Sequence, residues 1–141
     1  MPDGKIILDD ASITVDGVDL SDHGNHVEIT SEKEERDVTG FGASSREIAL
    51  GLGDGSIAIT FLQDFAAGSV DATLWPIHSN KSAVVVVIKP TSSAVAANNP
   101  SYTMTGVIPS YSPLNGDVGA ESTIDVTFRN AAQAGIVRAV A

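Results

Sequence analysis

Hydrophobic and polar residues alternate along most of this chain, which is typical of strands with one buried face. Residues 11–15 alternate, Asp16-Gly17 is a tight-turn signal, and residues 18–20 are predicted to return as the second strand of a small hairpin. Residues 25–35 then alternate over a longer run, with Val27 and Ile29 on one face. The opposite face is polar and acidic, and consists of Glu28, Thr30, Glu32 and Glu34.

Further strands are predicted along the rest of the chain. Residues 46–50 and 56–61 have strand character, and the glycine-rich residues 51–55 predict a turn that joins them into a second hairpin. Residues 82–89 form a continuous β-branched run, which is typical of a central strand buried on both faces. Residues 101–110 and 119–128 complete the set, the last with Ile124, Val126 and Phe128 inward.

One segment, residues 61–78, departs from the strand pattern and predicts a short helix. Ser69 is a good N-cap, and Pro76 is expected to end or kink the helix. Apolar residues one turn apart, with a phenylalanine from the preceding turn, are expected to hold the helix against the sheet. They are Phe65, Val70, Leu74 and Trp75. The predicted fold is therefore mostly β with one short helix.

Residues 32–47 predict a long loop, because glycines and small polar residues break the alternation. Such a loop is often only a solvated connection, and in that case Phe41 at its middle would be only a local anchor. A loop of about a dozen residues is nevertheless uncommon in a compact domain and is often functional. Charges of both signs and an exposed aromatic residue suit a contact with another subunit. The residues concerned are Glu34, Glu35, Arg36, Asp37, Phe41, Arg46 and Glu47.

The length of 141 residues fits a single domain, residues 1–141, with flexible terminal arms at about 1–10 and 131–141. No signal segment is visible, and no stretch approaches the roughly 18 apolar residues of a membrane span, so no membrane partner is expected. The net charge is −10, which repels nucleic-acid phosphates and argues against sequence-specific DNA or RNA recognition. The absence of cysteine excludes disulfides and thiol-based sites.

Candidate catalytic and metal-binding residues do not rise above background. His23 and His26 lie three apart near two aspartates, but in a glycine-containing turn where a solvated role is the better interpretation. Residues 16–22 lack the spacing and the closing glutamate of a calcium loop. Neither a Gly-x-Ser-x-Gly elbow nor a phosphate-binding loop is present. We therefore predict no enzyme activity, no metal and no cofactor.

Several segments, in order, resemble the tail tube (major tail) proteins of long-tailed bacteriophages of the siphophage type. They are residues 13–23, 27–30, 37–42, 55–65, 72–75 and 111–113. The resemblance runs from about residue 12 to residue 129 and includes the long loop before the second hairpin and the lone helix after it. It implies a β-sandwich or half-barrel with a flanking helix, in which six copies form a ring and rings stack into a tube.

The same resemblance implies that the loop at residues 32–47 reaches the adjacent ring and that terminal arms reinforce contacts between subunits. It implies further partners among tail proteins (tape measure, terminator and distal tail), a place in the virion tail, and assembly in the host cytoplasm. The genome would pass through the tube without specific binding.

Elementary physics suggests how such a chain would work. Unpaired strand edges are templates for pairing, and head-to-tail closure into a ring satisfies all of them. A face bearing Glu28, Thr30 and Glu32 would line a passage to which DNA does not adhere. The residues leave open whether this face points inward or forms the outer surface. The leading hypothesis is a structural tail-tube subunit. The alternatives are a monomeric β-sandwich binding module (an adhesin or carbohydrate-binding domain) and an enzyme with a dispersed site.

Overall fold

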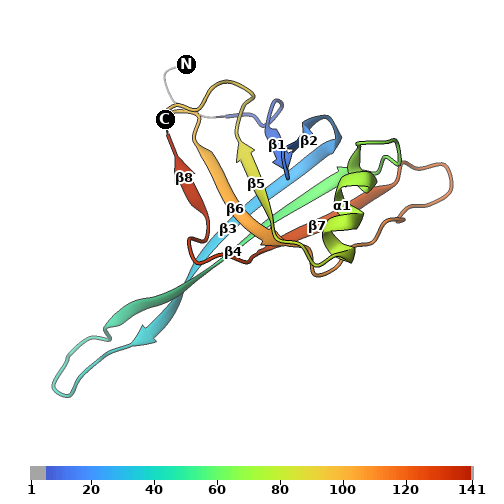
Figure 1. The fold of residues 1–141 in the computed structure, drawn as a ribbon. Coiled ribbons are helices and arrows are strands. Elements are labelled where there is room, and N and C mark those ends of the chain that lie inside the picture. The colour runs from blue at the N-terminus through green and yellow to red at the C-terminus, as the bar shows by residue number, and fades with distance from the viewer. Residues whose placement is uncertain (1–5, 141) are drawn as a thin grey trace.

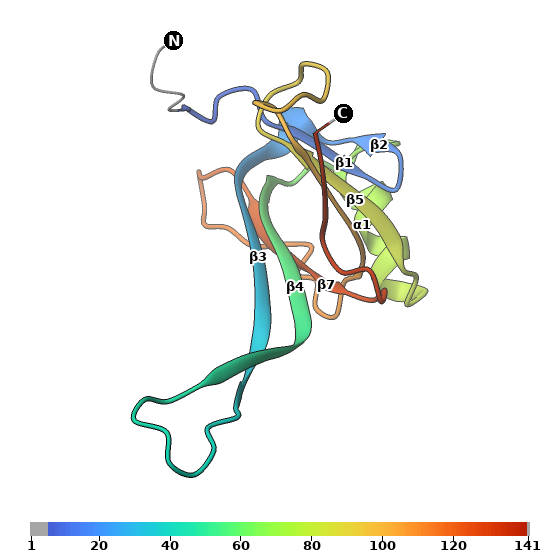
Figure 2. The ribbon, with the colours of Figure 1, turned by 90° about the vertical axis from the view of Figure 1, so that its left-hand side faces the viewer.

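The computed structural model of the protein describes residues 6–140, which form one curved antiparallel sheet and one α-helix (Figures 1 and 2). The strands are β1 (Ser12–Val15), β2 (Val18–Asp19), β3 (Gly24–Asp37), β4 (Ile48–Leu62), β5 (Val84–Lys89), β6 (Ser101–Val107), β7 (Thr123–Asn130) and β8 (Val137–Ala139). A 3₁₀ turn, Ser21–His23, precedes β3, and the helix α1 is Val70–Ser79. The predicted fold class, mostly β with one short helix, is confirmed.

The sheet order is β2-β1-β5-β6-β7-β4-β3, and β8 also pairs with β6. Because the sheet is single and open, with β2 at one edge and β3 at the other, the architecture is the half-barrel form of the expected fold. No helix among the described residues is long and apolar enough to cross a membrane.

The core follows from the period-2 pattern of the strands. On β4 the inward positions are Ile57, Ile59 and Phe61, and all three are buried. They lie opposite the inward residues of β7, in the pairs Ile57–Phe128, Ile59–Val126 and Phe61–Ile124. The inward set predicted for the last long strand, Ile124, Val126 and Phe128, is therefore confirmed.

The opening hairpin is also confirmed. β1 pairs with β2 in register Val15–Val18, and the two residues between them, Asp16 and Gly17, have φ angles of 52° and 81°. Two successive positive φ angles define the turn that matches the twist of a tight hairpin, and Asp-Gly is a favoured sequence for it.

The prediction for residues 82–89 is half right. β5 lies between β1 and β6, as expected of a central strand. Its burial nevertheless alternates: Val84, Val86 and Ile88 face the core, whereas Val85 is 46% exposed. The prediction of burial on both faces was wrong because the described part of the chain covers only one face of this strand.

The expected C-terminal arm at 131–141 contains a strand. β8 pairs with β6 through Ser101–Ala139, Tyr102–Arg138 and Thr103–Val137. Its place in the sheet corrects the prediction of a free arm, since backbone pairing holds this segment against the same chain. Residue 141 and residues 1–5 of the expected N-terminal arm lie outside the described residues, and residues 6–10 are exposed and form no strand or helix.

Two of the four apolar residues expected to hold the helix against the sheet, Val70 and Leu74, are buried as predicted, and the other two are not. Val70 and Leu74 are fully buried, and Ile77 is buried with them. Phe65 and Trp75 are 58% and 48% exposed, so Phe65 does not enter the core as expected and Trp75 covers it only in part. In a helix that begins at Val70, positions 70, 74 and 77 share one face, which is the face turned to the sheet.

Pro76 does not end the helix. α1 continues to Ser79, and the backbone N–H of Asn80 donates to the carbonyl oxygen of Pro76 at 2.9 Å. A proline near the last turn removes a single intrahelical hydrogen bond, a loss that the packing of the helix offsets.

Tyr111 ties the chain after β6 to the first turn of α1. Its hydroxyl donates to Asp71 Oδ1 at 2.9 Å and accepts from Gln63 Nε2 at 3.2 Å. Burial of the phenol, together with the hydrogen bond to Asp71, raises the pKa of Tyr111 to about 12. Because the folded-state pKa lies above the ordinary value of about 10, the protonated phenol stabilises the fold fully below pH 10, and this contribution is lost as the pH rises towards 12.

We therefore expect Tyr111→Phe to lower the free energy of unfolding by about 1 kcal/mol at pH 8, through loss of the hydroxyl hydrogen bonds. The difference from the parent chain should shrink between pH 10 and pH 12. Urea unfolding at pH 8, 10 and 11 measures both effects. A difference that stays constant across this range would contradict the role assigned to the phenol.

Candidate assembly surfaces

The largest departure from a compact domain is an arm, which we define as residues 32–54, the far ends of β3 and β4 with the loop 38–47 between them. Its strands pair from Glu32–Asp54 to Asp37–Ile48, whereas β7 accompanies β4 only along residues 56–62. The arm is therefore a two-stranded ribbon that projects from the body (Figures 1 and 2). Every residue in it is exposed.

The arm corrects two predictions. Residues 32–37 are strand rather than loop, and residues 51–55 continue β4 rather than forming a turn. Their glycines lie beside an irregularity in the register between Lys33 and Glu35, where β4 has one extra residue. Glycine in a strand often marks such a bulge. These glycines stay in a strand because β3 pairs with them, and a pairing partner cannot be read from the local sequence pattern.

The loop at the end of the arm is ordered by its own hydrogen bonds. Thr39 Oγ1 accepts from the backbone N–H of Glu47 at 2.7 Å, and the Thr39 N–H donates to Asp37 Oδ1 at 3.0 Å. The hydrogen bonds from Thr39 hold the pKa of Asp37 below its usual value. Gly42, with φ of 86°, turns the chain at the far end. Phe41 beside it is fully exposed.

The structure brings all seven residues of the predicted loop contact onto the arm. Glu34, Glu35, Arg36 and Asp37 lie on β3, and Phe41, Arg46 and Glu47 lie in the loop. Two ion pairs form within the arm, Arg36–Glu34 at 2.8 Å and Arg46–Asp37 at 3.7 Å. Pairs this exposed contribute at most about 1 kcal/mol, so they can exchange for pairs with another molecule at little cost.

The sequence reasoning missed an apolar component of the arm. Val38, Ile48, Leu50 and Leu52 are 52%, 46%, 66% and 82% exposed. The last three occupy alternate positions of β4, a strand-like spacing that the expectation of a turn at 51–55 concealed. An isolated two-stranded ribbon is marginally stable in water, and gathered exposed apolar side chains mark interaction sites. The arm therefore has the properties of a surface that another molecule covers.

The residues predicted to line a passage lie together on the outer surface of β3, β4 and β7, which we call the polar face. Glu28, Thr30 and Glu32 alternate with the core-facing Val27 and Ile29. Register places them opposite Ala58, Ser56 and Asp54 of β4, and Ala58 and Ser56 in turn pair with Thr127 and Arg129 of β7. The charged residues of the polar face are Glu28, Glu32, Asp54, Asp125 and Arg129.

Contacts across the polar face involve its cation and two of its carboxylates. Arg129 Nη2 lies 2.9 Å from Asp54 Oδ2, and Thr60 Oγ1 donates to Asp125 Oδ1 at 2.6 Å. Four carboxylates against one guanidinium leave this surface with a net negative charge.

The free edges of the sheet offer a second kind of surface. Within residues 6–140, β3 pairs only with β4, so one side of a 14-residue strand has no neighbour. At the other end of the sheet, β2 pairs only with β1. An unpaired edge as long as that of β3 is a template for strand pairing between molecules.

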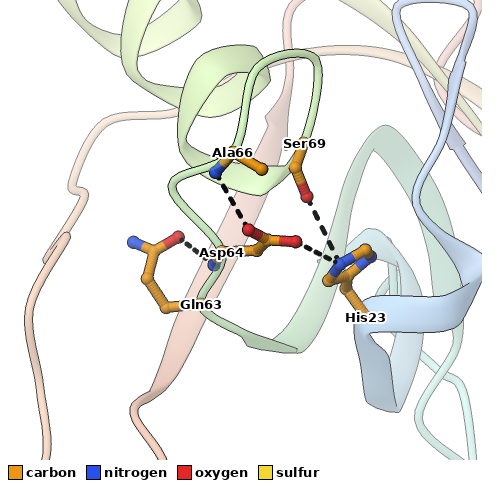
Figure 3. A network of polar contacts seen from close by, with 5 residues as sticks. All are labelled: His23, Gln63, Asp64, Ala66 and Ser69. Atoms are coloured by element: carbon orange, nitrogen blue, oxygen red, sulfur yellow. Dashed lines mark hydrogen bonds and ion pairs between the residues drawn. The ribbon is translucent and has the colours of Figure 1, made fainter.

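His23, Asp64 and Ser69 have the composition of a hydrolytic triad, but not its geometry (Figure 3). Asp64 Oδ2 and Ser69 Oγ lie 2.9 Å and 3.3 Å from the same histidine nitrogen, Nε2. A triad needs the carboxylate and the hydroxyl on opposite ring nitrogens. Asp64 Oδ1 also accepts from the Ala66 N–H at 2.9 Å, and this bond, followed by those from Ser69 and His23, lowers the pKa of Asp64. The network ties the 3₁₀ turn to the start of α1.

The described residues contain no group of three or more His, Asp or Glu side chains arranged to hold a metal ion. His23 is engaged by Asp64, whereas His26 lies exposed on β3, opposite Thr60. The two histidines do not converge on a site.

No protein-family model matches the sequence, and no curated protein matches it. Solved structures do share its fold. A chain of the virion of a native gene transfer agent particle superposes with a TM-score of 0.74 at 16% identity, over 95% of this chain and 98% of that one. The SPP1 tail tube superposes with a TM-score of 0.76 at 13% identity, and the match covers 97% of this chain and 80% of that one. The tail of an empty gene transfer agent particle with C6 symmetry superposes with a TM-score of 0.66 at 15% identity, and the match covers 84% of this chain and 82% of that one.

Proposed function

We propose that this chain is a structural, non-enzymatic subunit of a phage-type tail tube, in which hexameric rings of identical copies stack into a tube. The observation on which this depends is the arm, an exposed ribbon that carries apolar side chains and a charged loop, on a domain that has the fold of tail tube proteins. The C6 symmetry of the gene transfer agent tail supports six copies per ring. Other tail proteins, namely a tape measure, a terminator and a distal tail protein, are proposed partners, with assembly in the host cytoplasm and a final place in the virion tail.

Ring closure would use the edges of the sheet. The outer edge of β3 on one copy meets an edge of the next copy, and repetition around a closed ring leaves no edge free. This arrangement is head-to-tail, so each copy uses two different surfaces.

Stacking would use the arm. Its charged loop and its exchangeable ion pairs lie beyond the point where β7 ends its pairing with β4 at Ser56, so they add little to the stability of the monomer. Contact with a copy in the adjacent ring would cover them. The residues proposed to make this contact are Glu34, Glu35, Arg36, Asp37, Phe41, Arg46 and Glu47.

The polar face would line the lumen. Its net negative charge removes the counterion-release driving force by which cationic surfaces bind DNA, so a genome passes without adhering. Arg129, which pairs with Asp54 at 2.9 Å, offsets one of the four carboxylates and leaves three in excess.

A charge reversal on the polar face tests its position. Tubes of Glu28→Lys with Glu32→Lys, assembled with double-stranded DNA, should retain DNA that is protected from nuclease, with binding that weakens steeply with salt. Parent tubes should retain none. The matched control, Asp117→Lys with Glu121→Lys, makes the same charge change in the exposed loop between β6 and β7, and should bind only nuclease-sensitive DNA. Nuclease-sensitive DNA on both variants would place the polar face on the outside.

Electron microscopy of the purified, concentrated chain tests the proposal as a whole. Rings or tubes with a central channel are the expected result. A sample that remains monomeric at every concentration, with or without other tail proteins, would contradict it and would favour a monomeric binding module.

A further inference from the structure

An apolar groove of about 480 Å³ opens on the side of the half-barrel where β3 faces β5, β6 and β8. Its walls include Val27 and Ile29 of β3, Ile88 of β5 and Ile136 next to β8. These side chains face the core side of the sheet, yet Val27, Ile29 and Ile136 remain only partly buried. The groove is therefore a part of the core that the described residues do not close.

The lining also carries positive charge. Lys89 at the end of β5 and Arg138 on β8 border the groove, with Tyr102 between them on β6, and no carboxylate is among the described lining residues. Two cations in one groove are notable on a chain with 8 basic and 18 acidic residues. The site suits an apolar group flanked by carboxylates.

We propose that this groove receives the end of the arm of a second copy of the chain, with Phe41 as the inserted side chain. The inference rests on the proposed function, because it specifies where the arm of one ring binds the next. A fully exposed phenylalanine at the tip of an ordered loop is a suitable anchor, since aromatic side chains bury about 150–250 Å² each and dominate interface energetics.

Charge supports the same occupant. Residues 32–47 contain five carboxylates and three cations, a net charge of −2. Asp37 and Glu47 lie at the base of the loop that presents Phe41, so an inserted arm would bring them towards the Lys89 and Arg138 side of the groove. Opposite charges at the border of a contact select its partner and orientation more than they add affinity.

The positions of the two features favour contact between copies. The loop of the arm lies at one end of the molecule, and the ends of β5 and β8 and the start of β6 lie at the other, next to the chain termini (Figures 1 and 2). A copy therefore cannot fill its own groove. Shifting a second copy along this long axis brings its arm to the groove of the first, a contact that repeats head-to-tail, as stacking requires.

The absence of cysteine in the chain allows a direct crosslinking test. Double variants combine Phe41→Cys with Tyr102→Cys, Ile136→Cys or Arg138→Cys. Three partner positions are used because a disulfide requires a Cβ separation of roughly 4 Å, which at least one of them should meet. Oxidised tubes of at least one variant should yield a ladder of covalent oligomers longer than six chains, which reductant collapses to monomer. The control, Phe41→Cys with Trp75→Cys, places the second thiol on exposed α1 and should give none.

A competing occupant is the loop at residues 112–122 of a neighbour within the ring, where Leu114 and Val118 are 76% and 106% exposed. Crosslinks to Tyr102→Cys from Leu114→Cys or Val118→Cys, without any from Phe41→Cys, would overturn the proposal. So would tubes in which all three Phe41→Cys pairs stay uncrosslinked; the proposed function would survive that result. Failure of the parent chain to form tubes would instead reject the proposed function itself.

A second measurement uses the concentration above which tubes form. Phe41→Ser should raise it about tenfold or more, because an anchor of the interface is lost, whereas Phe65→Ser, at another exposed phenylalanine outside the arm, should leave it unchanged. Equal effects of the two substitutions would contradict the role of Phe41.

Discussion

A chain in which an Asn-Gly turn joins Glu32 directly to Asp54 is expected to remain stably folded and to form no tubes. Glu32 and Asp54 lie opposite each other in the β3–β4 ladder, so a short turn can replace everything beyond them. The residues removed are all exposed and belong to no part of the core. Assembly should fail because the deletion removes both the apolar residues of the arm and its charged loop.

Two measurements separate folding from assembly in this variant. The melting temperature should stay within a few degrees of the parent value, because surface changes outside the core cost little. Sedimentation velocity and electron microscopy should show monomers or single rings at concentrations where the parent forms tubes. Tubes built from the shortened chain would show that the arm is dispensable for stacking.

The same substitution at two phenylalanines four residues apart is expected to have opposite outcomes. Phe61→Ala should destabilise the fold by about 3–5 kcal/mol, since the ring, on β4 opposite Ile124 of β7, is fully buried and its loss leaves a cavity. Phe65→Ala should cost about 0.5 kcal/mol or less, because its ring is 58% exposed. Domains of this size are stable by only about 5–15 kcal/mol, so the first change removes a large part of the total.

Urea unfolding followed by circular dichroism measures both variants against the parent chain. If Phe61→Ala leaves no folded population, Phe61→Leu provides a milder change whose loss is still measurable. Comparable losses at Phe61 and Phe65 would mean that Phe65 packs into the core after all, as the sequence pattern suggested.

The position of Phe65 illustrates where local reasoning ends. Its aromatic character and its place before a helix both favour burial, but the helix begins at Val70 and turns Val70, Leu74 and Ile77 towards the sheet. The turn before it is directed instead by the contacts of Asp64 with Ala66 and His23. A histidine 41 residues away cannot be inferred as a partner from spacing.

The sequence predicted which charged residues share a surface better than it predicted the secondary structure in which they lie. The alternation from Val27 to Glu32 predicts which side chains oppose the core, and the structure places Glu28, Thr30 and Glu32 on one outer surface. The same reasoning grouped the seven charged and aromatic residues now found on the arm. The sequence pattern did not show that these residues lie on a two-stranded ribbon, nor that Leu50 and Leu52 are exposed on the same ribbon.

The amino-acid sequence by itself determined the mostly β class, the Asp16-Gly17 hairpin, the single helix and the inward rows of β4 and β7, because each depends on a period or a turn preference within a few neighbouring residues. Only the tertiary structure decided that β4 runs through its glycines, that β8 joins β6, and that the loop of the arm lies far from the groove of its own chain. These features depend on pairing between segments distant in sequence, and the free energy of such pairing appears in no local pattern.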